Sequence, residues 1–114
     1  MREVLFSVAE AVNKYDLGSL ERAIGKLKAR GDLYCGFNAI GSDGTIYLSN
    51  VGAKMTEFQW NDGILTGEVE LLSTPVGVEI LKSRHIAKWK MKSRGNFCDG
   101  YYVVDEILGF EWSL

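Results

Sequence analysis

The chain has 114 residues, of which 46% are hydrophobic, and a formal net charge of −2. This length supports one hydrophobic core, so we expect a single domain over residues 1–114. The charge balance excludes a general attraction to nucleic acid or to an anionic membrane, and neither a membrane span nor a signal peptide is indicated. Two cysteines, Cys35 and Cys98, are too few for a disulfide framework or a zinc site. We expect a soluble protein made in a cytoplasm, with reduced thiols and no cofactor or metal.

The first third of the chain predicts one strand and one helix. Partial alternation of β-branched and aromatic residues favours a strand within residues 3–12. Ser19 is the expected cap of a helix whose basic C-terminal end stops at Gly31. Its apolar stripe falls at i, i+3, i+4 and i+7 and consists of Leu20, Ala23, Ile24 and Leu27.

The middle of the chain predicts strands joined by tight turns. Asp43-Gly44 and Asp62-Gly63 are typical hairpin turns between apolar or aromatic runs. We therefore expect three strands, near residues 33–39, 45–58 and 64–73.

A second helix and two strands are predicted for the remainder. Thr74 before Pro75 favours a helix that runs to about Ser83, in which Gly77 is expected to cost roughly 1 kcal/mol relative to alanine. Strands are expected over residues 86–92 and about 101–112. Many short strands with two short helices predict an α+β, mainly β fold. The expected architecture is a small, antiparallel-rich, Greek-key-like barrel with the helices outside.

The strand over residues 86–92 alternates lysine with apolar residues, so it presents one mostly basic face. This face is a candidate site for an anion or an acidic partner surface. The alternative is a strand whose lysines only prevent pairing with other sheet edges. The candidate binding residues are Lys88, Lys90, Lys92 and Arg94.

Residues 67–95 resemble the prohead proteases of tailed phages, which are serine proteases of the herpesvirus-assemblin type. The shared order is a strand, the helix start Thr74-Pro75-Val76-Gly77, a basic helix, and a strand ending in Lys92-Ser93-Arg94-Gly95. Where this chain has Lys92-Ser93-Arg94-Gly95, the family has Ser-Ser-Arg-Gly. Hairpins over residues 31–72 and a closing strand over 105–114 extend the resemblance to nearly the whole chain. It implies the same helix-flanked barrel.

The resemblance also implies that the catalytic machinery is degenerate. Ile40 stands where the family has its histidine base, and Lys92 replaces the first serine of the pair. Ser93 is retained, but a serine without a general base is a weak nucleophile. The only histidine, His85, lies in the turn before the basic strand, where a surface role is expected and a rewired Ser93–His85 pair is the alternative. We therefore expect a pseudo-protease rather than an enzyme.

The expected function is that of a non-catalytic phage protein that binds in capsid assembly or maturation. It would be a structural, decoration or protease-regulating component, located in the host cytoplasm or the virion. Its expected partners are capsid or prohead proteins, with self-association through an exposed β edge; no membrane is expected, and nucleic acid is not the expected partner. Two alternatives remain. One is a host-takeover or anti-defence factor that binds a host protein or a nucleotide-like ligand. The other is an atypical serine protease that uses Ser93.

Overall fold

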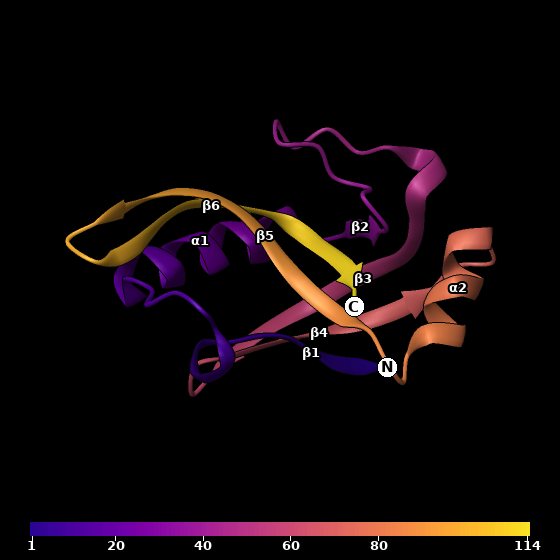
Figure 1. The fold of residues 1–114 in the computed structure, drawn as a ribbon, viewed down its shortest axis with the longest axis horizontal. Coiled ribbons are helices and arrows are strands. Elements are labelled where there is room, and N and C mark those ends of the chain that lie inside the picture. The colour runs from indigo at the N-terminus through magenta and orange to yellow at the C-terminus, as the bar shows by residue number, and fades with distance from the viewer.

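The computed structural model describes residues 1–114 and shows an α+β fold made mainly of strands. Six strands form one sheet in the order β1-β4-β3-β2-β6-β5, which curls into a half-barrel (Figure 1). The predicted fold class is confirmed, with the barrel left open between its two outer strands. The elements are β1 (Arg2–Ser7), α1 (Leu17–Arg30), β2 (Leu33–Gly36), β3 (Val51–Asn61), β4 (Ile64–Leu71), α2 (Pro75–Ser83), β5 (Lys88–Cys98) and β6 (Tyr101–Ser113).

The strand order has a Greek-key arrangement. Strands β2, β3 and β4 follow one another as antiparallel neighbours, and β1 lies beside β4 after a connection that contains α1. Only one neighbouring pair, β2 with β6, is parallel, and it is joined by a single bridge. None of the helices is long and apolar enough to cross a membrane.

Helix α1 packs on the sheet through its predicted apolar stripe. All four stripe residues are buried, and Gly31 ends the helix with a positive φ of 80°. The expected cap was wrong, because Asp16 and not Ser19 caps the helix: the Asp16 carboxylate accepts the Ser19 N–H at 2.9 Å. Ser19 lies in the first turn, where its hydroxyl accepts the Val104 N–H at 3.0 Å and so ties α1 to β6.

The two predicted hairpin turns have different outcomes. Asp62-Gly63 joins β3 to β4, and both residues have positive φ, 51° and 75°, as a type I′ turn requires. The prediction that Asp43-Gly44 connects two long strands was wrong, because this turn closes only the isolated bridge Ile40↔Ile46. The Asp43 carboxylate accepts the Thr45 N–H at 2.9 Å, which makes a local turn. Strand β3 therefore starts only after a loop over residues 37–50.

The longest hairpin of the molecule was not predicted. Asp99 and Gly100, with φ of 52° and 83°, join β5 to β6 in a second turn of the same kind. The hairpin reaches the left end of the molecule in Figure 1. Its tip is fastened to the segment before α1, since the Tyr102 N–H donates to Lys14 O and the Asp16 N–H donates to Tyr102 O.

Helix α2 begins as predicted. The Thr74 hydroxyl accepts the Gly77 N–H at 3.0 Å, and the helix ends at Ser83. Gly77 has a role that its low helix propensity does not reveal: a Cβ there would lie 2.0 Å from Leu72 O and 3.0 Å from Gly52 O. The first turn of α2 thus sits directly on sheet backbone, and only glycine allows that approach.

Candidate functional site

The first candidate region is the predicted basic face of β5, on which lysine alternates with inward-facing residues. Lys92 is held closely: its ammonium group donates to Ile40 O at 2.6 Å and lies 3.4 Å from a Glu111 carboxylate oxygen. The structure therefore brings together Ile40 and Lys92, the two positions that were predicted to be degenerate catalytic positions. Lys92 acts here as a bridge between β5, β6 and the loop that carries Ile40.

The other cations of this face also have partners, with one exception. Arg94 forms an ion pair with Glu106 on β6, and the Lys90 ammonium donates to Leu114 O at 2.9 Å. The side chain of Lys88 is exposed, and its ammonium group makes no hydrogen bond or ion pair. Because carboxylates on β6 neutralise Lys92 and Arg94, the face offers less free positive charge than the sequence suggests.

The geometry around Ser93 does not form a nucleophile and base pair. The nearest polar partner of its hydroxyl is Tyr102 OH at 3.4 Å. His85 is exposed in the turn after α2. Extended chain rises about 3.3 Å per residue, so the stretch from Lys88 to Ser93 alone spans roughly 16 Å and keeps His85 out of hydrogen-bond reach.

The second candidate region is the seam where the half-barrel stays open. Strands β1 and β5 are the outer strands of the sheet, and each pairs with only one neighbour. Their Cα atoms come within 8 Å of each other, and the two ribbons then diverge (Figure 1). The seam thus leaves two rows of backbone N–H and C=O groups without strand partners.

A groove of about 640 Å³ occupies this seam, which we call the seam groove. It is lined by β1, the segment that follows β1, and the start of β5. Its lining includes buried or half-buried aromatic and aliphatic side chains, namely Leu5, Phe6, Tyr15, Trp89 and Met91. Val4 and Val12 also line it, although they are 58% and 101% exposed. The charged lining residues are Lys88, Lys90 and Glu10.

Trp89 is the residue of the groove with an unmet chemical requirement. It is 5% exposed, and its indole N–H is the one buried side-chain polar atom without a hydrogen-bond partner. Its cross-strand neighbour Trp112, at a ring-centroid distance of 5.0 Å, donates to the Ser83 hydroxyl at 2.7 Å. An unpaired buried donor costs about 1–3 kcal/mol, so burial of this N–H lowers the stability of the fold.

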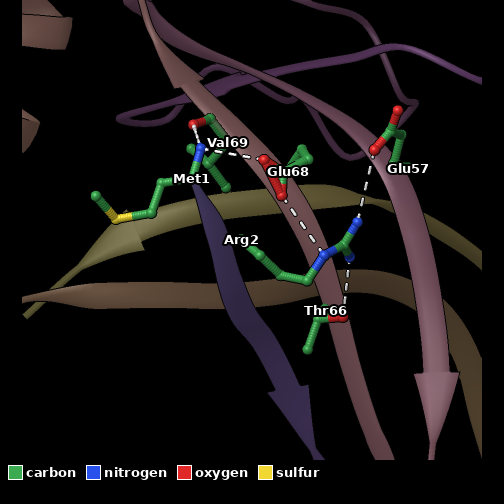
Figure 2. Close-up of polar contacts among 6 residues, drawn as sticks. All are labelled: Met1, Arg2, Glu57, Thr66, Glu68 and Val69. Atoms are coloured by element: carbon green, nitrogen blue, oxygen red, sulfur yellow. Dashed lines mark hydrogen bonds and ion pairs between the residues drawn. The ribbon is translucent and has the colours of Figure 1, made fainter.

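Strand β1 is fastened to β4 by a group of polar contacts on the outer face of the sheet (Figure 2). The Arg2 guanidinium donates to the Thr66 hydroxyl at 3.1 Å and lies 3.5 Å from Glu68 and 3.8 Å from Glu57. Glu57 has a positive φ of 53° at a bulge in β3, which turns its carboxylate toward β1. These contacts hold the edge of β1 that pairs with β4, and the opposite edge of β1 faces the groove.

The backbone pattern shows which groups of β1 lie on that free edge. Met1 and Val69 exchange two hydrogen bonds, with Met1 N to Val69 O at 3.1 Å and Val69 N to Met1 O at 2.8 Å. Hydrogen-bonded and non-bonded residues alternate along an antiparallel pair. Glu3 therefore bonds toward β4, whereas the N–H of Val4 points away from β4.

A smaller hollow of about 240 Å³ on β3 and β4 is lined by charged residues, most of which already have partners. Glu68 pairs with Arg2, and Lys54 pairs with Asp32, whose hydrogen bond and charge raise the pKa of the ammonium group. This hollow is therefore a less suitable site than the seam groove. No group of His, Cys, Asp and Glu side chains is arranged to hold a metal ion.

The sequence gives little signal for the seam groove. Its two walls lie more than seventy residues apart in the chain, and its apolar members look like ordinary core residues. The one local sign is Trp89 in the middle of the lysine-rich strand. No protein-family model, curated protein or solved structure matches the chain.

Proposed function

We propose that this chain is a non-catalytic protein that binds an extended segment of another protein in the seam groove. The observation that carries this proposal is a groove of about 640 Å³ between two free sheet edges, with apolar lining residues such as Leu5, Phe6 and Met91. Extended peptides bind such edges by adding a strand, so that main-chain hydrogen bonds supply affinity and side-chain pockets supply specificity.

The lining of the groove favours a protein segment over a small molecule. A small-molecule pocket is concave and encloses most of its ligand. Here Val4 and Val12 are largely exposed to solvent while lining the groove. Exposed apolar side chains of this kind gain most when a partner chain covers them.

The setting we propose is the assembly or maturation of a phage capsid. Its support is the resemblance to prohead proteases, which implies a barrel-like sheet and a helix that starts at Thr74-Pro75, together with the curled sheet and the Thr74-capped helix of the structure. The arrangement around Ser93 supports binding rather than peptide cleavage, because its hydroxyl has Tyr102 and not a histidine beside it.

Selection of peptides tests the binding proposal. A displayed library of random linear peptides is selected on the purified chain, and the selected peptides are measured against three variants. Val4→Pro removes a free-edge N–H without breaking the pairing with β4, and Val12→Ser removes an apolar side chain from the groove. Each should weaken binding by about tenfold or more, equivalent to roughly 1.4 kcal/mol. Leu48→Ser is the control, since Leu48 is 82% exposed and lies outside the groove.

Retention of binding by both groove variants would overturn the proposed site. The setting is tested separately: proheads purified from cells infected by the phage that encodes the chain should contain it. Its absence from both proheads and virions would overturn the capsid role. Cleavage of a capsid-protein peptide that is lost in Ser93→Ala would instead establish the protease alternative.

A further inference from the structure

Building on the proposed function, we infer that the bound segment is a β-strand antiparallel to β5 in which apolar side chains alternate with acidic ones. The inference concerns three properties of the partner: its direction, its position in the seam and its side-chain pattern. Each follows from a different feature of the groove.

The direction follows from the topology of the sheet. Along the order β1-β4-β3-β2-β6-β5, four neighbouring pairs are antiparallel and one, β2 with β6, is parallel. Four reversals leave β1 and β5 running the same way. A strand that is antiparallel to β5 is therefore antiparallel to β1 as well. It can make the more favourable kind of ladder with either edge.

The position follows from the width of the seam. A strand placed between two others needs about 9.6 Å, twice the usual strand spacing of about 4.8 Å. At their closest approach, Cα atoms of β1 and β5 are within 8 Å, so a strand does not fit between them there. The segment thus lies in the part of the groove whose other wall is formed by Glu10 to Asn13 rather than by β1, and there it pairs with the free edge of β5. On the opposite side the chain leaves β1 for the 3-10 helix Val8–Glu10.

The side-chain pattern follows from the two faces of an added strand. One face points into the groove, over Leu5, Phe6 and Met91, and requires apolar side chains. The other face points outward beside Lys88, the one cation of β5 without a polar partner.

The charge balance around the groove selects acidic residues for that outer face. Two lysines, Lys88 and Lys90, line the groove against one carboxylate, Glu10. Complementary charge discriminates among partners and speeds their association, while a like charge placed opposite a lysine is rejected.

Synthetic peptides test the pattern on the full chain. Three peptides of equal length alternate Val with Glu, Val with Lys, and Ser with Glu, and their affinities are measured by isothermal titration calorimetry at low salt. The Val-Glu peptide should bind about tenfold more tightly than either of the others. Lys88→Glu should reverse the preference between the Val-Glu and Val-Lys peptides. Lys26→Glu, on an exposed position of α1 outside the groove, should leave it unchanged.

The direction is tested by a paramagnetic label at either end of the best-binding peptide. In the antiparallel arrangement, a C-terminal label broadens the amide signals around Lys88, and an N-terminal label broadens those beyond Met91. The indole N–H signal of Trp89 should shift on binding more than that of Trp112, which is already bonded to Ser83. The opposite broadening pattern would overturn the inferred direction.

The outcomes separate this inference from the proposal beneath it. Library peptides that bind through the groove, combined with equal affinity for Val-Glu and Val-Lys or no binding of any alternating peptide, would overturn the inferred pattern and leave the binding function standing. Library peptides that bind regardless of Val12→Ser would overturn both.

Discussion

The outer face of β5 and the seam groove along its free edge belong to one strand. They differ in whether their polar groups have hydrogen-bond or ion-pair partners. On the outer face, Lys92 and Arg94 meet carboxylates of β6. In the groove, the N–H of Trp89 has no acceptor and the strand edge has no neighbour. A run of charge that is conspicuous in a sequence can thus be internally neutralised, while a site with unmet bonds consists of residues that look like core.

The largest difference we expect within the lysine face is between Lys92 and Lys88. Lys92→Met should lower the free energy of unfolding by about 2 kcal/mol, because it removes a charged donor from the partly buried Glu111 and from Ile40 O. Lys88→Met should change it by less than about 0.5 kcal/mol, as for an unpaired surface residue. Urea unfolding measures both. Equal effects would show that Lys92 is no more structural than Lys88.

The two tryptophans give a second contrast, between a satisfied and an unsatisfied indole. Both phenylalanine variants lose part of a packed ring, but Trp112→Phe also loses the hydrogen bond to Ser83, whereas Trp89→Phe removes a donor that has no partner. Trp112→Phe should therefore cost about 1 kcal/mol more than Trp89→Phe. Urea unfolding with a common slope is the measurement. A larger cost for Trp89→Phe would mean that its N–H is bonded in solution.

The edge of the groove formed by β1 depends on the contacts in Figure 2. Arg2→Gln should destabilise the protein by about 0.5–1 kcal/mol, the range for partly exposed ion pairs, and should speed hydrogen exchange in β1. Arg22→Gln is the matched control, because Arg22 is exposed on α1 without an ion pair. Unchanged exchange in β1 would show that backbone pairing with β4 suffices to hold the strand.

The smallest expected effect lies on the same strand, at Glu3. Desolvation by burial raises the pKa of this carboxyl, partly offset by the Met1 amino group. Folding thus disfavours its charged form, so its stabilising contribution is present below the unfolded pKa of about 4.3 and is lost as pH rises through the folded value. Glu3→Gln should raise the free energy of unfolding at neutral pH by no more than about 0.5 kcal/mol, because solvent reaches the side chain. A slightly higher melting temperature is the measured result. The gain should disappear at pH values well below the ordinary carboxyl pKa. A gain that persists there would come from a cause other than charge.

Local patterns predicted most elements of the fold, because the signals that define them lie within a few residues. The stripe at Leu20 and Leu27, the turn at Asp62-Gly63 and the Thr74 cap are all confirmed. The failures occurred where a distant contact decides the local outcome. Asp16 and not Ser19 caps α1, and the Ser19 hydroxyl accepts the N–H of Val104, which lies eighty-five residues away in the chain. Gly77 is required by the backbone of Leu72 and Gly52.

The candidate site divides in the same way. The sequence alone determined that β5 is a lysine-rich strand with Trp89 on its other face, because side chains alternate every residue along a strand. Only the tertiary structure decided which of those groups are free. Pairing with β6 neutralises Lys92 and Arg94, and the curl of the sheet brings β1 and β5 to the two sides of one groove. Partners and edges are set by contacts between residues far apart in the chain, and no local pattern records them.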